Sequence, residues 1–170
     1  MSNALSIDPR CWLPLLATLA FPAAQATPKL PPEIPILIQG THLVADLQPL
    51  LADTRNSEIT RVFLCRRTGS HCYRTLWDVE FPKGWQEPKL EILGKYSGSS
   101  VNAWVPEALQ PGGSYVLDIS FNERSRWHKQ TVSNTSAAFC LEGSADAWKL
   151  LGAAACLARQ NAEDQQGATP

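Results

Sequence analysis

The sequence predicts a mainly β protein, an antiparallel β-sandwich that is immunoglobulin-like by analogy and carries one C-terminal α-helix. Three observations predict this fold. Short β-rich runs recur along the chain, turn-forming Gly, Pro, Asn and Ser residues separate them, and the apolar period becomes helical near the C-terminus. Several short strands at such spacing are typical of two packed antiparallel sheets.

Residues 1–26 have the composition of a cleaved signal peptide. The apolar run 11–24 precedes Ala-Gln-Ala at 24–26, which fits a signal-peptidase site after Ala26. Pro14 and Pro22 argue against the alternative of a buried N-terminal helix, since proline breaks a helix interior. The run is also shorter than the ~20 residues that span a bilayer. We therefore expect a periplasmic or secreted protein without a membrane-spanning segment.

The remainder of the chain is long enough for one domain with a core of its own. Residues 27–33 are expected to form an extended Pro-rich lead-in, residues 34–160 a single β-sandwich domain, and residues 161–170 a disordered tail. The whole chain carries 15 Lys and Arg against 16 Asp and Glu, a net charge of −1. This balance argues against a dedicated nucleic-acid-binding protein, which is usually strongly basic.

The strands are expected where β-branched and aromatic residues alternate with polar ones. Their ranges are 34–39, 42–47, 59–66, 71–81, 89–94, 99–105, 114–122 and 130–141. In 71–81 the expected buried face is Tyr73, Thr75, Trp77, Val79 and Phe81, and the expected wet face includes Arg74, Leu76, Asp78 and Glu80. Residues 43–52 are ambiguous between strand and helix, because their leucines have helical spacing and Pro49 interrupts them.

The helix is expected over residues 144–159. Ser144 is a good N-cap residue, and an acidic residue follows in the first turn. The apolar residues share one arc, which consists of Ala147, Leu150, Leu151, Ala154, Leu157 and Ala158. Cys156 lies on the opposite side of this arc, so a helix packed by its apolar arc would turn Cys156 away from the sheet.

Four cysteines remain after the expected cleavage: Cys65, Cys72, Cys140 and Cys156. An even number in an exported chain indicates disulfides. The short spacings of zinc sites and the redox pattern C-x-x-C are absent, so we expect no metal and no cofactor. Cys65 and Cys72 enclose six residues and are expected to face each other across a hairpin, with Leu64 opposite Tyr73. Cys140 would then pair with Cys156 by exclusion.

The stapled loop is rich in cations, and a second loop resembles it. The disulfide either serves as a hairpin lock alone or also presents a rigid recognition tip. In the second stretch, residues 123–129, the alternative is a solvated hairpin end. The candidate binding residues are Arg66, Arg67 and His71 in the first loop and Arg124, Arg126 and Trp127 in the second.

Catalytic motifs are not recognisable. The chain has three histidines but neither G-x-S-x-G nor H-E-x-x-H. The sequence therefore predicts a non-catalytic binding or adaptor protein that recognises another macromolecule, a protein of the envelope or extracellular space. An inhibitor-like or toxin-neutralising protein and an envelope-assembly accessory both fit. The alternatives are a carbohydrate- or small-ligand-binding module that uses Trp85, Trp104 or Trp127, and a small envelope hydrolase.

Overall fold

The computed structural model describes most of the predicted domain. The described residues are 32–53, 58–68, 71–105, 109–124, 130–143 and 147–167. The predicted signal peptide and most of the predicted lead-in lie outside them. In the part of the chain that is described, neither helix has the length and apolar character needed to cross a membrane.

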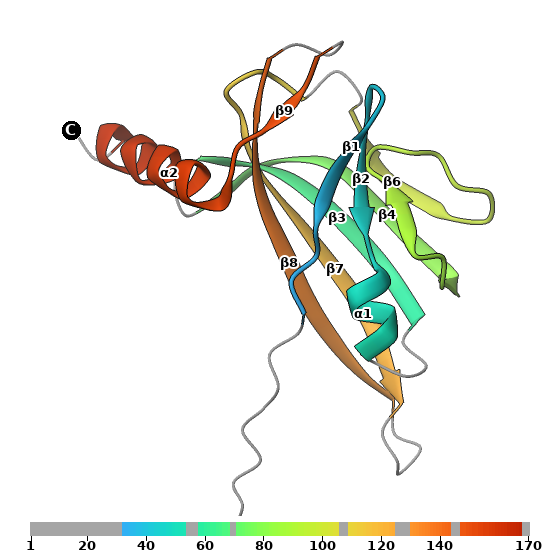
Figure 1. Cartoon of the computed structure of the whole chain (residues 1–170). Coiled ribbons are helices and arrows are strands. Elements are labelled where there is room, and N and C mark those ends of the chain that lie inside the picture. The colour runs from blue at the N-terminus through green and yellow to red at the C-terminus, as the bar shows by residue number, and fades with distance from the viewer. Residues whose placement is uncertain are drawn as a thin grey trace, which may run out of the picture.

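The larger of two antiparallel sheets has six strands in the order β6-β4-β3-β7-β8-β9. Its strands are β3 (Glu58–Thr68), β4 (His71–Trp85), β6 (Ser100–Trp104), β7 (Ser114–Arg124), β8 (Gln130–Glu142) and β9 (Lys149–Leu150). The long strands β3, β4, β7 and β8 curve together along the molecule (Figure 1). Because β3 and β7 run antiparallel, the tip of the β3–β4 hairpin lies at one end of this sheet and the C-terminal end of β7 lies at the other.

The smaller sheet has three strands in the order β1-β2-β5 and lies against one face of the larger sheet (Figure 1). Its strands are β1 (Ile36–Gln39), β2 (His42–Asp46) and β5 (Lys89–Glu91). The ambiguous segment 43–52 divides between strand and helix: β2 ends at Asp46, and α1 (Gln48–Asp53) follows. The Asp46 carboxylate accepts a hydrogen bond from the backbone N–H of Gln48 at 3.0 Å, which satisfies one donor of the new helix.

Side chains of both sheets meet in one hydrophobic core, so the predicted sandwich is confirmed. Its buried members include Leu43, Ala45 and Leu90 from the smaller sheet and Val62, Leu64, Trp77, Val79, Leu117, Ile119 and Phe139 from the larger. Each predicted strand is present with ends that differ by a few residues. The immunoglobulin-like topology stays an analogy.

The expected register of the stapled hairpin is wrong. Leu64 lies opposite Trp77 and not opposite Tyr73, and the β3–β4 pairing shifts register at three places. Two of the shifts, between Leu64 and Cys65 and between Arg66 and Arg67, each leave one unpaired residue in β4, as a β-bulge does, and change the face of the residues that follow. Tyr73 is the extra residue of the shift between Arg66 and Arg67, and it is 77% exposed instead of buried.

Two side chains expected on the wet face of 71–81 are also buried, and one of them, Leu76, is the extra residue of the shift between Leu64 and Cys65. Leu76 is buried in the core, and Asp78 is 6% exposed. Asp78 is compensated by Arg61, whose Nε and Nη2 donate to its two carboxylate oxygens at 2.8 and 2.6 Å. This two-point ion pair satisfies the buried carboxylate and locks β3 to β4.

The C-terminal helix begins later than predicted and ends later as well. β9 occupies Lys149–Leu150, and α2 runs from Ala153 to Gly167. Leu150 pairs with Leu141 as a strand residue, and Gly152 separates β9 from the helix. The predicted disordered tail therefore contributes residues 161–167 to α2, where Ala, Gln and Glu favour a helix. Residues 168–170 and the expected N-cap Ser144 lie outside the described part.

This shift reverses the face that α2 presents to the sheet. Cys156 and Gln160, four residues apart, are buried, whereas Leu157 of the expected apolar arc is 58% exposed. Cys156 forms a disulfide with Cys140 of β8, and the two Cα atoms are 5.4 Å apart. The predicted pairing is therefore present, and the expectation that Cys156 points away from the sheet is wrong.

Candidate functional site

The hairpin of β3 and β4 ends in the predicted disulfide between Cys65 and Cys72, whose Cα atoms are 5.7 Å apart. Beyond Cys65, Arg67 pairs with Cys72 and Thr68 pairs with His71. The staple therefore crosses the ladder diagonally instead of joining directly opposed residues. It fixes the end of the hairpin on which the predicted binding residues Arg66, Arg67 and His71 lie.

This end of the hairpin is positively charged, and the neighbouring sequence contains no acidic residue. Arg66 lies directly opposite Arg74, a pairing of like charges that destabilises a sheet. Residues 59–77 contain no Asp or Glu, and Tyr73, which is exposed, directly precedes Arg74 in the chain. We call Arg66, His71, Tyr73 and Arg74 the basic hairpin surface.

Sequence reasoning missed two members of this surface, Tyr73 and Arg74. The charge of Arg74 was visible, but strict alternation placed it on the wet side of a regular strand with no link to Arg66. The exposure of Tyr73 depends on a bulge, and a bulge depends on how two strands pair. Nothing in the run of residues 71–81 alone signals it.

A buried tyrosine positions Arg66. The Arg66 guanidinium donates through Nη1 to Gln110 Oε1 at 2.6 Å. The backbone N–H of Gln110 donates to the Tyr115 hydroxyl at 2.7 Å, and that hydroxyl donates to the Gln110 carbonyl at 3.2 Å. Burial raises the pKa of Tyr115, so the hydroxyl remains protonated near neutral pH and can keep donating. Tyr115 thereby fixes the loop that holds Arg66.

Replacing Tyr115 by Phe tests this support. We expect the free energy of unfolding to fall by about 1–2 kcal/mol, because the Gln110 amide loses its partner while the ring keeps its packing. Urea unfolding followed by fluorescence measures the change. The matched control is Tyr73→Phe, which removes a hydroxyl from an exposed ring and should leave stability unchanged. Equal stability of both variants and the parent would contradict the positioning role of Tyr115.

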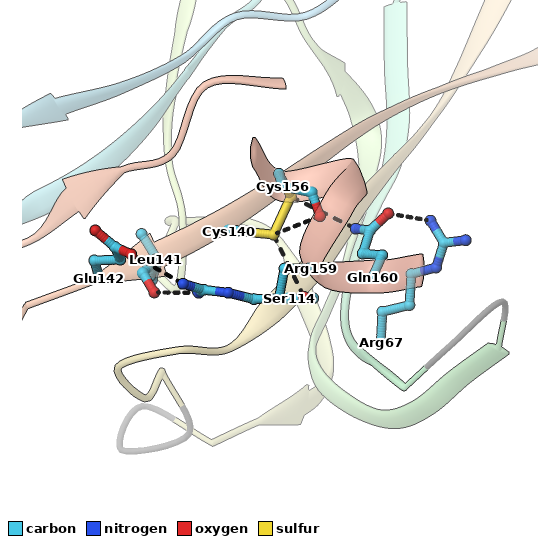
Figure 2. The surroundings of a disulfide bond; sticks show 8 residues. All are labelled: Arg67, Ser114, Cys140, Leu141, Glu142, Cys156, Arg159 and Gln160. Atoms are coloured by element: carbon cyan, nitrogen blue, oxygen red, sulfur yellow. Dashed lines mark hydrogen bonds and ion pairs between the residues drawn. A yellow bond between two sulfur atoms is a disulfide. The ribbon is translucent and has the colours of Figure 1, made fainter. Parts of the chain in front are cut away.

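The other arginine of the loop, Arg67, connects the hairpin to α2 (Figure 2). Arg67 donates through Nη1 to Gln160 Oε1 at 3.2 Å, and Gln160 Nε2 donates to Cys156 Sγ at 3.6 Å. On the other side of the disulfide, Arg159 forms an ion pair with Glu142 at 2.9 Å. The disulfide and these polar contacts hold α2 beside the hairpin end of the sheet (Figure 1).

A groove of about 470 Å³ opens next to this helix. Its lining comes from residues 33–36, from β8 residues 136–139, from Leu150 and Leu151, and from Cys156, Leu157 and Gln160 of α2. Arg67 also lines the groove, so the groove and the stapled hairpin are contiguous. Most of the lining is apolar or small, which suits a peptide segment better than a highly charged ligand.

The second predicted loop lies away from the first. Arg67 pairs with Ser114 at the start of β7, whereas Arg124 ends β7 at the opposite end of the sheet. Arg126 and Trp127 lie outside the described residues. The structure therefore brings Arg66, Arg67 and His71 together and separates Arg124 from them.

The tryptophans of the carbohydrate alternative are engaged within the protein. The Trp85 ring packs against Phe81 and Tyr96, with centroids 5.3 and 4.7 Å away. Trp104 is partly exposed, but the Lys95 ammonium lies 4.1 Å from its ring centroid and its indole N–H donates to the Leu93 carbonyl. Both rings thus already have partners on the protein.

Neither a catalytic nor a metal site is visible where the structure is described. His42 pairs through Nδ1 with Glu91 at 2.6 Å, and both side chains are well exposed on the smaller sheet. A hydrolase site of the serine type needs a hydroxyl nucleophile beside the histidine and the carboxylate, and this pair has none hydrogen-bonded to it in the described residues. Within the described ranges, His, Cys, Asp and Glu side chains do not form a group of three or more that could hold a metal ion.

Comparisons with known proteins place the chain in a family. No protein-family model matches it, and no solved structure matches it. The "Type VI lipase immunity protein Tli3" of Pseudomonas aeruginosa is 54% identical over 147 residues, which cover 86% of this chain and 89% of the relative. An immunity protein is a binding protein, so the prediction of a non-catalytic binder is confirmed at this level. With this identity across most of both chains, the protein belongs to the family of the type VI lipase immunity protein Tli3.

Proposed function

We propose that this chain is an immunity protein that binds a lipase and thereby neutralises it. The description of the relative, a type VI lipase immunity protein, supports this role. A non-catalytic sandwich with a rigid, charged hairpin end suits such a task. The sequence predicts a protein partner in the envelope, and we propose that this partner is a lipase.

We propose further that the chain acts in the periplasm after cleavage behind Ala26. The residues 1–26 have the pattern of a signal peptide, and the two disulfides require an oxidising compartment. N-terminal sequencing of the protein recovered from the periplasm should begin at Thr27. Recovery of an uncleaved chain with reduced cysteines would contradict export.

The single observation that carries the proposed binding surface is the opposition of Arg66 and Arg74. Two arginines placed face to face cost stability in the free protein, and an acidic surface on the lipase would relieve that repulsion. Arginine binds carboxylates with two parallel hydrogen bonds. Tyr73 supplies the exposed aromatic ring that anchors many protein interfaces.

The disulfide strengthens this argument. A surface that is already ordered loses less conformational entropy when it binds. The staple between Cys65 and Cys72 and the Gln110–Tyr115 support fix the hairpin end before the lipase arrives. The second predicted set, Arg124, Arg126 and Trp127, is proposed as a separate contact, because Arg124 lies at the other end of the sheet.

A capture experiment tests the function. The mature chain, residues 27–170, is immobilised with its disulfides intact and exposed to an envelope fraction of the native bacterium. We expect a lipase to be retained, and we expect its ester hydrolysis to fall when the mature chain is added in excess. A chain retaining no lipase, or retaining one whose activity is unaffected, would contradict the proposal.

A further inference from the structure

The outer edge of β8 lacks a strand partner over most of its length in the described part of the chain. β7 pairs with β8 from Gln130 to Cys140 along one edge. On the other edge β9 pairs only with Leu141 and Glu142. In the described residues, the stretch from Gln130 to Phe139 therefore has no backbone pairing on this edge, although the Thr135 hydroxyl donates to the Pro32 carbonyl at 3.4 Å.

The direction of the backbone groups along this edge follows from two hydrogen bonds. The Cys140 carbonyl accepts from Leu151 on the outer side, and the Leu141 N–H donates to Gly113 on the β7 side. Because alternate residues of a strand point their N–H and C=O groups to alternate sides, Ser136 and Ala138 direct theirs outward. These groups are available to an added strand.

The sequence of this edge lacks the residues that usually protect a sheet edge against strand addition. Exposed edges are normally blunted by charges, prolines or bulges. Residues 130–141 contain no charged residue and no proline, and the pairing of β7 with β8 has no register shift. Val132 on the same edge is 69% exposed. A strand edge that is regular and uncharged can pair with an additional strand.

The groove lies over the same stretch. Residues 136–139 of β8 line it together with segment 33–36 and with α2. We propose that an extended, uncharged segment of the lipase enters this groove and adds to β8 as a further strand, which deepens and rests on the proposed lipase-binding function. Main-chain hydrogen bonds to Ser136 and Ala138 supply affinity, and the apolar lining selects small or apolar side chains.

Two other occupants fit less well. In a second copy of this chain the same stretch of β8 is flanked by α2 and segment 33–36, so two such edges cannot approach each other closely at residues 136–139. The chain's own residues 27–31 contain Pro28 and Pro31, which lack the N–H groups that a ladder needs. A lipase segment also benefits from Arg67, which lines the groove and belongs to the stapled hairpin, so one partner reaches both features.

The variant Ala138→Pro tests the added strand. Proline removes an outward N–H that β7 does not use, so the fold should persist. We expect the affinity for the captured lipase to fall roughly tenfold or more, measured by calorimetry. The matched control is Val132→Pro, which makes the same change on the same edge outside the groove lining and should alter affinity less than about twofold.

Amide exchange of the unmodified mature chain gives an independent readout by NMR. We expect the Ser136 and Ala138 amides to exchange rapidly in the free chain and roughly tenfold or more slowly with lipase bound. If the lipase binds but does not slow this exchange, and if Ala138→Pro binds with unchanged affinity, the proposal of an added strand is wrong. The proposed lipase-binding function is then unaffected. Slow exchange of these amides in the free chain would also contradict the proposal. If that protection does not depend on protein concentration, residues 27–31 of the same chain cover the edge. If it does depend on concentration, a second copy of the chain covers it. Absence of any lipase binding removes both proposals.

Discussion

The double substitution R66E with R74E is expected to weaken lipase binding by roughly 100-fold or more. Charge-assisted hydrogen bonds contribute about 1.5–3 kcal/mol each, and reversal replaces two attractions to an acidic surface by two repulsions. The fold should persist, because both side chains lie near the turn of the hairpin and one like-charge pair replaces another. Calorimetric titration with the captured lipase measures the loss.

The control for this double substitution is Lys83→Glu, which reverses an exposed charge on the same strand far from the tip. It should change affinity little. Raising the salt concentration should weaken the parent complex and narrow its difference from the double variant, since salt screens exposed charges. Parent-like affinity of R66E with R74E would place the basic hairpin surface outside the interface.

The single substitution R66E separates charge from stability. The introduced glutamate would face Arg74 as an opposite charge, so we expect the hairpin to be as stable as the parent or slightly more stable while lipase affinity falls. A stability gain combined with an affinity loss is the expected mark of a residue retained for binding. Urea unfolding and calorimetry on the same sample measure the two quantities.

Strands β1 to β8 could be predicted from the sequence because each has a local signal. Ile119 and Phe121 alternate with polar neighbours, and both lie in the core as alternation requires. The Gly, Pro and Ser clusters at 97–99 and 111–113 correctly marked turns between strands, whereas the cluster Pro82-Lys83-Gly84, which also predicts a turn, lies within β4. Both disulfide pairings followed from the number of cysteines and the short loop between Cys65 and Cys72.

The predictions that failed concern features that depend on contacts between distant segments of the chain. The exposure of Tyr73 follows from a bulge between two paired strands, and periodicity within one strand carries no information about its partner. Leu150 fits a helical arc by spacing, yet pairing with Leu141 makes it a strand residue and moves the helix start to Ala153. The groove was invisible for the same reason, because β8, α2 and segment 33–36 meet only in the folded chain.

Replacing Cys140 and Cys156 together by serine is expected to lower the free energy of unfolding by about 3 kcal/mol. The two residues are 16 apart, and losing a cross-link over a loop of that length frees the unfolded chain by about that amount. The corresponding variant of Cys65 and Cys72, 7 residues apart, should lose only about 2 kcal/mol. Urea unfolding of both double variants against the parent measures the difference.

The two disulfide variants should also differ in which part of the molecule they loosen. Without Cys140–Cys156, α2 keeps only its polar contacts and packing, such as Arg67 with Gln160 and Arg159 with Glu142. Hydrogen exchange should therefore accelerate throughout α2, and lipase affinity should fall because one wall of the groove moves. The Cys65 and Cys72 variant should retain slow exchange in α2. Equal exchange of α2 in the parent and in both variants would show that the remaining contacts alone hold the helix, and the disulfide would then have no part in shaping the groove.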